Sequence, residues 1–212
     1  MQFSIDEEIR RLAESLHIYL NNKQLLEIMA HINLLQAWGR KMNLTSIQDP
    51  AEIARRHFLE GIVAGEKLRE LAAVGPLLDL GSGNGFPAVP MAVACQGARP
   101  VILVESSEKK AAFLRALIRD LEWMDARVEI RRAERCSDLA DLPCRVFTTR
   151  GVSISQFLRE GLTFLESGGW CVLFGLRAEL EKDYGNIPGL FVLEEEIRLP
   201  DRETRILCLR KT

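Results

Sequence analysis

Three glycines at alternate positions follow a short apolar segment of this chain. Leu-Leu-Asp-Leu at 77–80 leads into Gly81, Gly83 and Gly85, and Phe86-Pro87 is expected to start a helix of small residues. A bound molecule can approach the backbone at such a turn, because glycine has no Cβ to keep it away. The spacing therefore predicts a strand, a tight turn and a helix with a ligand over the turn. A tight turn with no ligand is the alternative.

Two acidic residues indicate which ligand this would be. Asp79 lies two residues before the first glycine, and Glu105 ends the apolar segment 101–104, twenty residues after Gly85. A carboxylate at the end of a second strand can bind both hydroxyls of a ribose. A dinucleotide site has the spacing G-x-G-x-x-G, whereas the spacing here is G-x-G-x-G, and Asp79 would repel a pyrophosphate. The same carboxylate suits the ammonium group of a methionine, so these residues predict an S-adenosylmethionine site.

The elements that position these residues are expected to alternate between strands and helices. Strand-like segments lie at 77–80, 101–105, 127–131, 145–149 and 169–175. Amphipathic segments such as 108–121 separate them, which implies a parallel sheet with helices on both faces. Two further strands, 190–197 and 204–210, are joined by so short a link that an antiparallel hairpin is favoured. These segments predict a Rossmann-like α/β fold with a mostly parallel seven-stranded sheet and an antiparallel C-terminal hairpin. Class I S-adenosylmethionine-dependent methyltransferases have this fold.

The first 70 residues have helical patterns. Ser4 and Glu7 form a capping box ahead of the first apolar face. A second helix carries one apolar face, which consists of Leu25, Ile28, Met29, Ile32, Leu35 and Trp38, with His31 beside it as a core residue. Asp49-Pro50 then supplies an N-cap and a first-turn proline for a third helix. We expect an N-terminal helical extension over 1–70 and a methyltransferase domain over 71–212, together one structural unit.

Composition limits the classes of function. The chain has 212 residues, a formal net charge of −2 and no apolar run long enough for a membrane span, and its N-terminus lacks a signal pattern. Its five cysteines are scattered without a C-x-x-C pair, which favours reduced thiols in a cytoplasm and argues against zinc. A protein that binds nucleic acid mainly by charge would be basic. The clustered cations nevertheless allow a local basic face; they are Arg40-Lys41, Arg55-Arg56, Arg131, Arg132, Arg135, Arg198, Arg202 and Arg205.

Rival chemistries can be compared at the fourth strand. Methylation of cytosine C5 needs a cysteine nucleophile, but Cys144 precedes this strand, whereas catalytic groups follow a strand's carboxyl end. Methylation of an exocyclic amine usually shows an Asn/Asp-Pro-Pro-aromatic loop, and the chain reads Thr-Thr-Arg-Gly at 148–151. The remaining acceptor is a nucleophile that needs no strong base, such as a ring nitrogen. Arg150 is a candidate catalytic residue by position, and His57 is a candidate for lining the site, with a core role as its alternative.

The sequence resembles the bacterial 16S ribosomal RNA guanine-N7 methyltransferases, also called glucose-inhibited division protein B. The matching segments are 42–50, 56–60, 78–87, 105–106 with 109–110 and 113–115, 149–151 and 168–169. The resemblance implies methylation of a guanine N7 in a decoding-region loop of 16S ribosomal RNA, as free RNA or in the small subunit, by a monomer. By motif matching, the cofactor contacts would be Gly81, Phe86, Ala133, Glu134 and Arg150. The RNA contacts would include Asn43, Thr45, Arg55 and Arg56.

Three residues depart from the family's pattern. Glu105 stands where the family usually has aspartate, Gly151 stands where it has alanine, and Phe174-Gly175 replaces a Lys-Gly pair. The missing lysine leaves room for an altered substrate. The alternatives are therefore a methyltransferase of a small molecule or a protein, and a methyltransferase-like protein that only binds RNA or a ribosomal particle.

Overall fold

The computed structural model describes residues 4–42, 49–73, 75–95, 100–150, 153, 155–176, 180, 189–199 and 203–212. The side chains at 40–42, 50, 51, 55 and 56 lie outside this description. The sequence-based expectations for Asn43, Thr45 and Gly151 therefore lie outside the described residues.

A seven-stranded sheet in the order β3-β2-β1-β4-β5-β7-β6 organises the molecule. The strands are β1 (Leu77–Leu80), β2 (Val101–Glu105), β3 (Ala126–Ile130), β4 (Val146–Thr149), β5 (Trp170–Leu176), β6 (Phe191–Arg198) and β7 (Thr204–Lys211). The first five pair in parallel, and β7 pairs antiparallel with both β5 and β6. Each strand lies within one residue of its predicted range, so the predicted fold class is confirmed.

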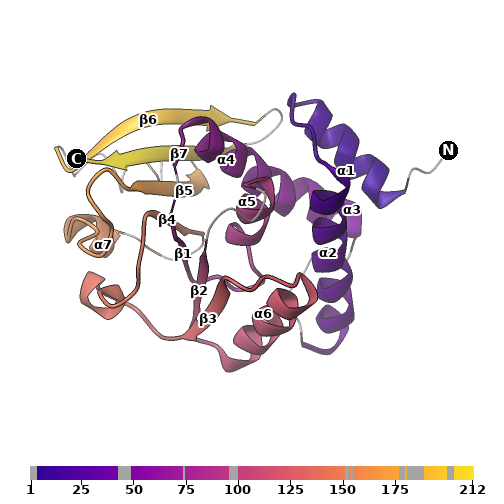
Figure 1. The fold of residues 1–212 in the computed structure, drawn as a ribbon, viewed down its shortest axis with the longest axis horizontal. Helices are drawn as coiled ribbons and strands as arrows, with labels where there is room; N and C mark the ends of the chain where they lie inside the picture. Colours follow the sequence, from indigo (N-terminus) through magenta and orange to yellow (C-terminus); the bar gives the residue numbers. More distant parts are fainter. Residues whose placement is uncertain are drawn as a thin grey trace.

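Helices cover both faces of this sheet. They are α1 (Ile5–Glu14), α2 (Asn22–Met42), α3 (Pro50–Ile53), a π-helical turn (Ala54–Phe58), α4 (Leu59–Glu70), α5 (Ala88–Ala94), α6 (Glu108–Asp120), a 3-10 turn (Cys136–Leu139) and α7 (Ser155–Arg159). Figure 1 shows α2, α4, α5 and α6 on one side of the sheet and α7 on the other. In the part of the chain that the structure describes, no helix has the length and apolar character needed to cross a membrane.

The alternation of side chains along the strands produces two cores. Leu77 and Leu103 face a core shared with α1, α2, α4, α5 and α6. Leu78, the next residue of β1, faces a second core on the other side of the sheet. Its partner on β4, Phe147, faces the same core, which α7 covers. Side chains of successive strand residues point to opposite faces of the sheet. A strand that is buried on both faces therefore has a continuous apolar sequence.

Two of the N-terminal helices, α1 and α3, begin where local signals predict. The Ser4 N–H donates to the Glu7 carboxylate at 3.1 Å, as in a capping box, and α3 begins at Pro50. Helix α5 begins at Ala88 instead of at Phe86, because Pro87 occupies its N-cap position and Phe86 still belongs to the turn. The buried Gln24 amide donates to the Val93 carbonyl at 3.0 Å and so joins α2 to the end of α5.

Candidate active site

The glycine turn leaves the carboxyl end of β1, between β2 and β4. The Gly81 N–H donates to the Val104 carbonyl at 2.8 Å, and the Gly85 N–H donates to the Ser82 carbonyl at 2.7 Å. Gly83 and Gly85 have φ values of +55° and +86°, in the region that favours glycine. The predicted turn is therefore present.

The two later glycines differ in what surrounds them. Among the described residues, a Cβ on Gly83 would meet only the Gly81 carbonyl oxygen, at 3.7 Å, so it would point into space that these residues leave open above the turn. A Cβ on Gly85 would lie 2.9 Å from Val89 Cγ2 and 3.2 Å from His31 Cε1. Gly83 thus leaves room for a ligand, and Gly85 leaves room for the protein's own side chains.

Asp79 is a fully buried carboxylate in β1. Neither of its oxygens has a hydrogen-bond partner among the residues that the structure describes. Burial raises the pKa of Asp79 well above its usual value, and the negative charge of Glu105 raises it further. A buried carboxylate without a partner is costly, and a ligand with a cationic group would offset that cost.

Glu105, at the end of β2, has its carboxylate next to the turn. One oxygen accepts the Gly83 N–H at 2.9 Å, and the other accepts the Ser107 N–H at 2.8 Å. The residue is only 6% exposed. Glu105 therefore connects the end of β2, the glycine turn and the start of α6.

Three rings from the N-terminal helices surround Phe86. The His31 and His57 rings stack on Phe86 with centroids 4.7 and 4.9 Å away, and Phe58 contacts it edge-on at 5.0 Å. The predicted position of His57 beside the site is consistent with this contact, because Phe86 directly follows the last glycine. The predicted extension thus packs on the turn itself.

His31 is more than the core residue that its helix face predicts. It is fully buried, and its Nε2 lies 2.7 Å from the Asn84 carbonyl oxygen, to which the ring donates as an Nε2–H tautomer. Burial lowers the pKa of His31 to about 3, although the bond to Asn84 opposes that change, so the ring is neutral near pH 7. The signal for this role was a histidine on an otherwise apolar face of α2.

Arg150 follows β4 directly, at the same edge of the sheet. Its Nη1 lies 2.5 Å from an oxygen of Glu60, a side chain of α4 that is 1% exposed. Glu60 was absent from the predicted site, although an acidic residue four and eight positions before the apolar Ala64 and Leu68, on the same helix face, was a signal for it. The structure brings Arg150 together with the N-terminal helices.

The remaining predicted residues lie at or beyond the same edge. Ala133 and Glu134 follow β3; Ala133 packs against the second core, and Glu134 is exposed and pairs with Arg132 at 2.8 Å. Phe174 is buried in β5. Arg131 and Arg135 also pair with carboxylates, those of Asp141 and Glu160.

The cysteines do not form a reactive group. All five are buried free thiols, and burial raises the pKa of Cys144 well above its usual value, which disfavours a thiolate. Among the described residues, no cluster of three histidine, cysteine or acidic side chains is arranged to hold a metal.

The strand order, with β7 antiparallel, and the glycine turn facing an acidic residue at the end of β2 define the class I S-adenosylmethionine-dependent methyltransferase fold. The magnesium protoporphyrin IX methyltransferase of Synechocystis PCC 6803, solved with bound S-adenosylmethionine, superposes with a TM-score of 0.57. It is 13% identical, and the match covers 86% of this chain and 97% of that one. Within this class, the chain belongs to the rRNA small subunit methyltransferase G family, whose model matches residues 24–184.

Relatives of this family match different shares of the chain. The ribosomal RNA small subunit methyltransferase G of Stenotrophomonas maltophilia is 37% identical over 145 residues, which cover 67% of this chain and 64% of that protein. This chain therefore matches just under two thirds of that relative's length. The protein of the same name from Leptothrix cholodnii is 30% identical over 207 residues, covering 93% of this chain and 92% of that protein.

Proposed function

We propose that the chain transfers the methyl group of S-adenosylmethionine to N7 of a guanine in a decoding-region loop of 16S ribosomal RNA. The observation that carries the proposal is Asp79, a buried carboxylate that has no hydrogen-bond partner among the described residues. It lies beside a glycine turn whose Gly83 faces space that the same residues leave open. These residues fit a cofactor that presents a cationic amino group. Membership of the small-subunit rRNA methyltransferase family supports the RNA substrate.

Each residue of the site has a proposed role. Asp79 receives the ammonium group, Gly81, Gly83 and Gly85 admit the cofactor to the backbone, and Glu105 binds the ribose hydroxyls. Further contacts are proposed for Phe86, Ala133, Glu134 and Arg150. When bound, S-adenosylmethionine supplies an electrophilic methyl group on a sulfonium.

Methyl transfer to guanine N7 requires alignment of the acceptor with the methyl group, and it requires no strong base. Guanine N7 holds an in-plane lone pair, so it can accept a methyl group without losing a proton. Arg150 orients cofactor or base by hydrogen bonding, and His57, stacked on Phe86, lines the site. Alignment of acceptor and donor by fixed groups is sufficient to supply much of the rate acceleration.

For the RNA we propose contacts at Asn43, Thr45, Arg55 and Arg56. The other candidate cations are Arg131, Arg132 and Arg135, which follow β3. Each of them is already paired with a carboxylate, which makes them weaker candidates for binding RNA phosphates. We further propose a cytoplasmic monomer in which 1–70 is an extension of the methyltransferase domain, 71–212.

The test is transfer of tritium from labelled S-adenosylmethionine to small subunits and to free 16S RNA, taken from a strain that lacks the gene. Label in one guanine, located by N7-specific strand cleavage, is expected, with no transfer by Asp79→Ala. Label in a protein or small molecule, or binding of RNA without transfer, would overturn the proposal in favour of another substrate or a binding role.

A further inference from the structure

Glu60 is a buried acidic residue that contacts Arg150 from a distant part of the chain. Its oxygen lies 2.5 Å from Arg150 Nη1, and the side chains are 1% and 29% exposed, respectively. Glu60 belongs to α4, before the sheet begins, and Arg150 follows β4. The ion pair therefore joins the N-terminal helices to the carboxyl end of the sheet.

This carboxyl end is the edge that carries the glycine turn. Thr149, the last residue of β4, pairs in register with Leu80, the last residue of β1, and its hydroxyl donates to the Leu80 carbonyl at 2.7 Å. Arg150 and Gly81 follow these two residues. The charge of the guanidinium thus lies at the edge where the proposed cofactor would bind.

We infer that Glu60 is a positioning residue that holds Arg150 and compensates its positive charge, so that a sulfonium cofactor can bind beside it. The inference rests on the function proposed above. Transfer of the methyl group moves positive charge from the sulfonium to the guanine ring, so a second, uncompensated cation would oppose both cofactor binding and the charge on the product. With Glu60 in place, the pair adds no net charge at this edge.

S-adenosylmethionine and S-adenosylhomocysteine can separate this role from a purely structural one. The two molecules share the ribose, the amino group and the carboxylate, but only the first carries the sulfonium charge. A variant that distorts the site weakens both ligands, whereas one that changes the charge beside the sulfur changes the ratio of their dissociation constants. At an effective dielectric constant of about 20, two unit charges less than about 12 Å apart repel by at least about 1.4 kcal/mol, a tenfold change in affinity.

The experiment is calorimetric titration of both ligands into the full chain and its variants. Glu60→Gln is expected to shift the ratio at least tenfold toward S-adenosylhomocysteine. Glu60→Asp, which keeps the charge, is expected to hold the ratio near that of the unmodified chain even if both affinities fall. Arg150→Gln is expected to shift the ratio the other way, and Glu60→Gln with Arg150→Gln is expected to restore it.

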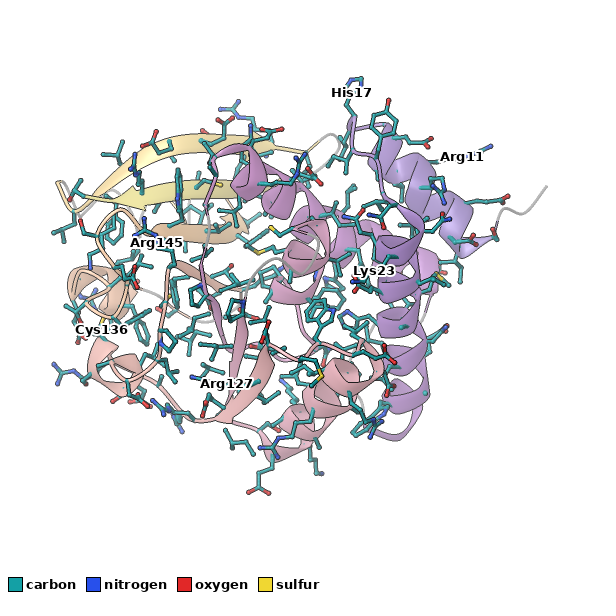
Figure 2. All side chains as sticks on the ribbon, in the orientation of Figure 1. Arg11, His17, Lys23, Arg127, Cys136 and Arg145 are labelled. Carbon is teal, nitrogen blue, oxygen red and sulfur yellow. The ribbon has the colours of Figure 1, made fainter. Side chains whose placement is uncertain are left out.

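The matched control is a second ion pair at the opposite end of the same strand. Arg145, labelled in Figure 2, precedes β4. Its Nη1 lies 3.5 Å from a Glu166 oxygen, so Glu166→Gln should leave the ratio unchanged. An unchanged ratio in both Glu60→Gln and Arg150→Gln would overturn the inference, and Arg150→Gln alone decides it if Glu60→Gln does not fold. Failure of the unmodified chain to bind either ligand would instead overturn the proposed function.

Discussion

The carboxylate of Glu105 accepts a hydrogen bond from the backbone N–H of Gly83 at 2.9 Å. Two features that the sequence predicts to bind different parts of one cofactor are therefore in direct contact with each other. The same carboxylate accepts the Ser107 N–H, so both of its oxygens have backbone partners. Charge-assisted bonds of this kind are stronger than neutral ones, and they hold the turn in shape before a ligand arrives.

We predict that Glu105→Ala weakens S-adenosylmethionine binding at least tenfold. The variant loses the proposed bonds to the ribose hydroxyls, each worth about 1.5–3 kcal/mol before competition with water, and also the support of Gly83. Glu105→Asp should have a mild effect, because the family usually carries aspartate here. Isothermal calorimetry measures both, with Glu129→Ala on the neighbouring strand as the control. Normal binding by Glu105→Ala would show that β2 does not end at the ribose.

Asp79→Asn should stabilise the free protein at neutral pH while removing most of its affinity for the cofactor. Because burial raises the pKa of Asp79, the folded protein binds this proton more tightly than the unfolded chain does. Stability therefore falls as pH rises from the ordinary carboxyl range through the raised pKa. The asparagine does not ionise, so it removes this loss, and the free energy of unfolding at neutral pH should increase by about 1.4 kcal/mol or more, the value of one pKa unit.

Urea unfolding at neutral pH and calorimetry measure the two effects of Asp79→Asn. The control is Asp141→Asn, which alters an exposed carboxylate paired with Arg131 and should leave cofactor affinity unchanged. A variant that is less stable than the unmodified chain yet binds the cofactor normally would contradict the role of Asp79.

Gly83→Val is expected to abolish S-adenosylmethionine binding in a protein that still folds. Its side chain would occupy the open space above the turn, and valine is strained at a φ of +55°. Gly189 provides the matched control, because it has a φ of +92° and no described residue within 4 Å of an added Cβ, yet it lies before β6. Gly189→Val should carry a similar strain and bind normally. Equal affinities in the two folded variants would place the ligand elsewhere.

The stability of the protein should depend on His31 in mildly acidic solution. The pKa of His31 is lowered from its usual 6.5 to about 3 by burial, so the unfolded chain takes up this proton first as the pH falls. The contribution of His31 is complete above 6.5 and is lost between 6.5 and 3. As the pH is lowered, the free energy of unfolding should fall less steeply in His31→Phe than in the unmodified chain. The two slopes should differ by up to about 1.4 kcal/mol per pH unit.

Chemical denaturation at pH 7, 6 and 5 would measure these slopes. His17, which points outward from the turn after α1 (Figure 2), supplies the control, and His17→Asn should keep the slope of the unmodified chain. The same slope in His31→Phe would mean that the buried ring does not titrate as proposed.

Arg150→Lys should lose most of the methyl-transfer activity with the protein still folded. Lysine keeps the charge but cannot reproduce bidentate hydrogen bonding by a guanidinium. Because N7 needs no deprotonation, the rate should also show no requirement for a base near neutral pH. Single-turnover rates over a range of pH test both points. Full activity in Arg150→Lys would remove the orienting role, and a rate that rises steeply through neutral pH would implicate His57 as a base and another acceptor.

The local sequence determined the strands, the glycine turn and the acidic residues beside it. These features follow from short-range physics, because strand patterning, the backbone freedom of Gly83 and Gly85 and the start of α3 at Pro50 depend on neighbouring residues. The parallel order also follows, since a strand joined through a helix to the next strand returns in the same direction. Asp79 and Glu105 were therefore placed correctly at one edge of the sheet from their positions alone.

Only the tertiary structure decided which distant side chains meet at this edge. The contact of Glu60 with Arg150, and those of His31 and His57 with Phe86, join residues that are 29 to 90 positions apart, as their numbers show. No local pattern specifies such contacts, because they depend on which face of α2 and α4 packs on the sheet and at what height. A buried charge or histidine on an apolar helix face signals that some partner exists, whereas the packing of the folded chain determines which partner it is.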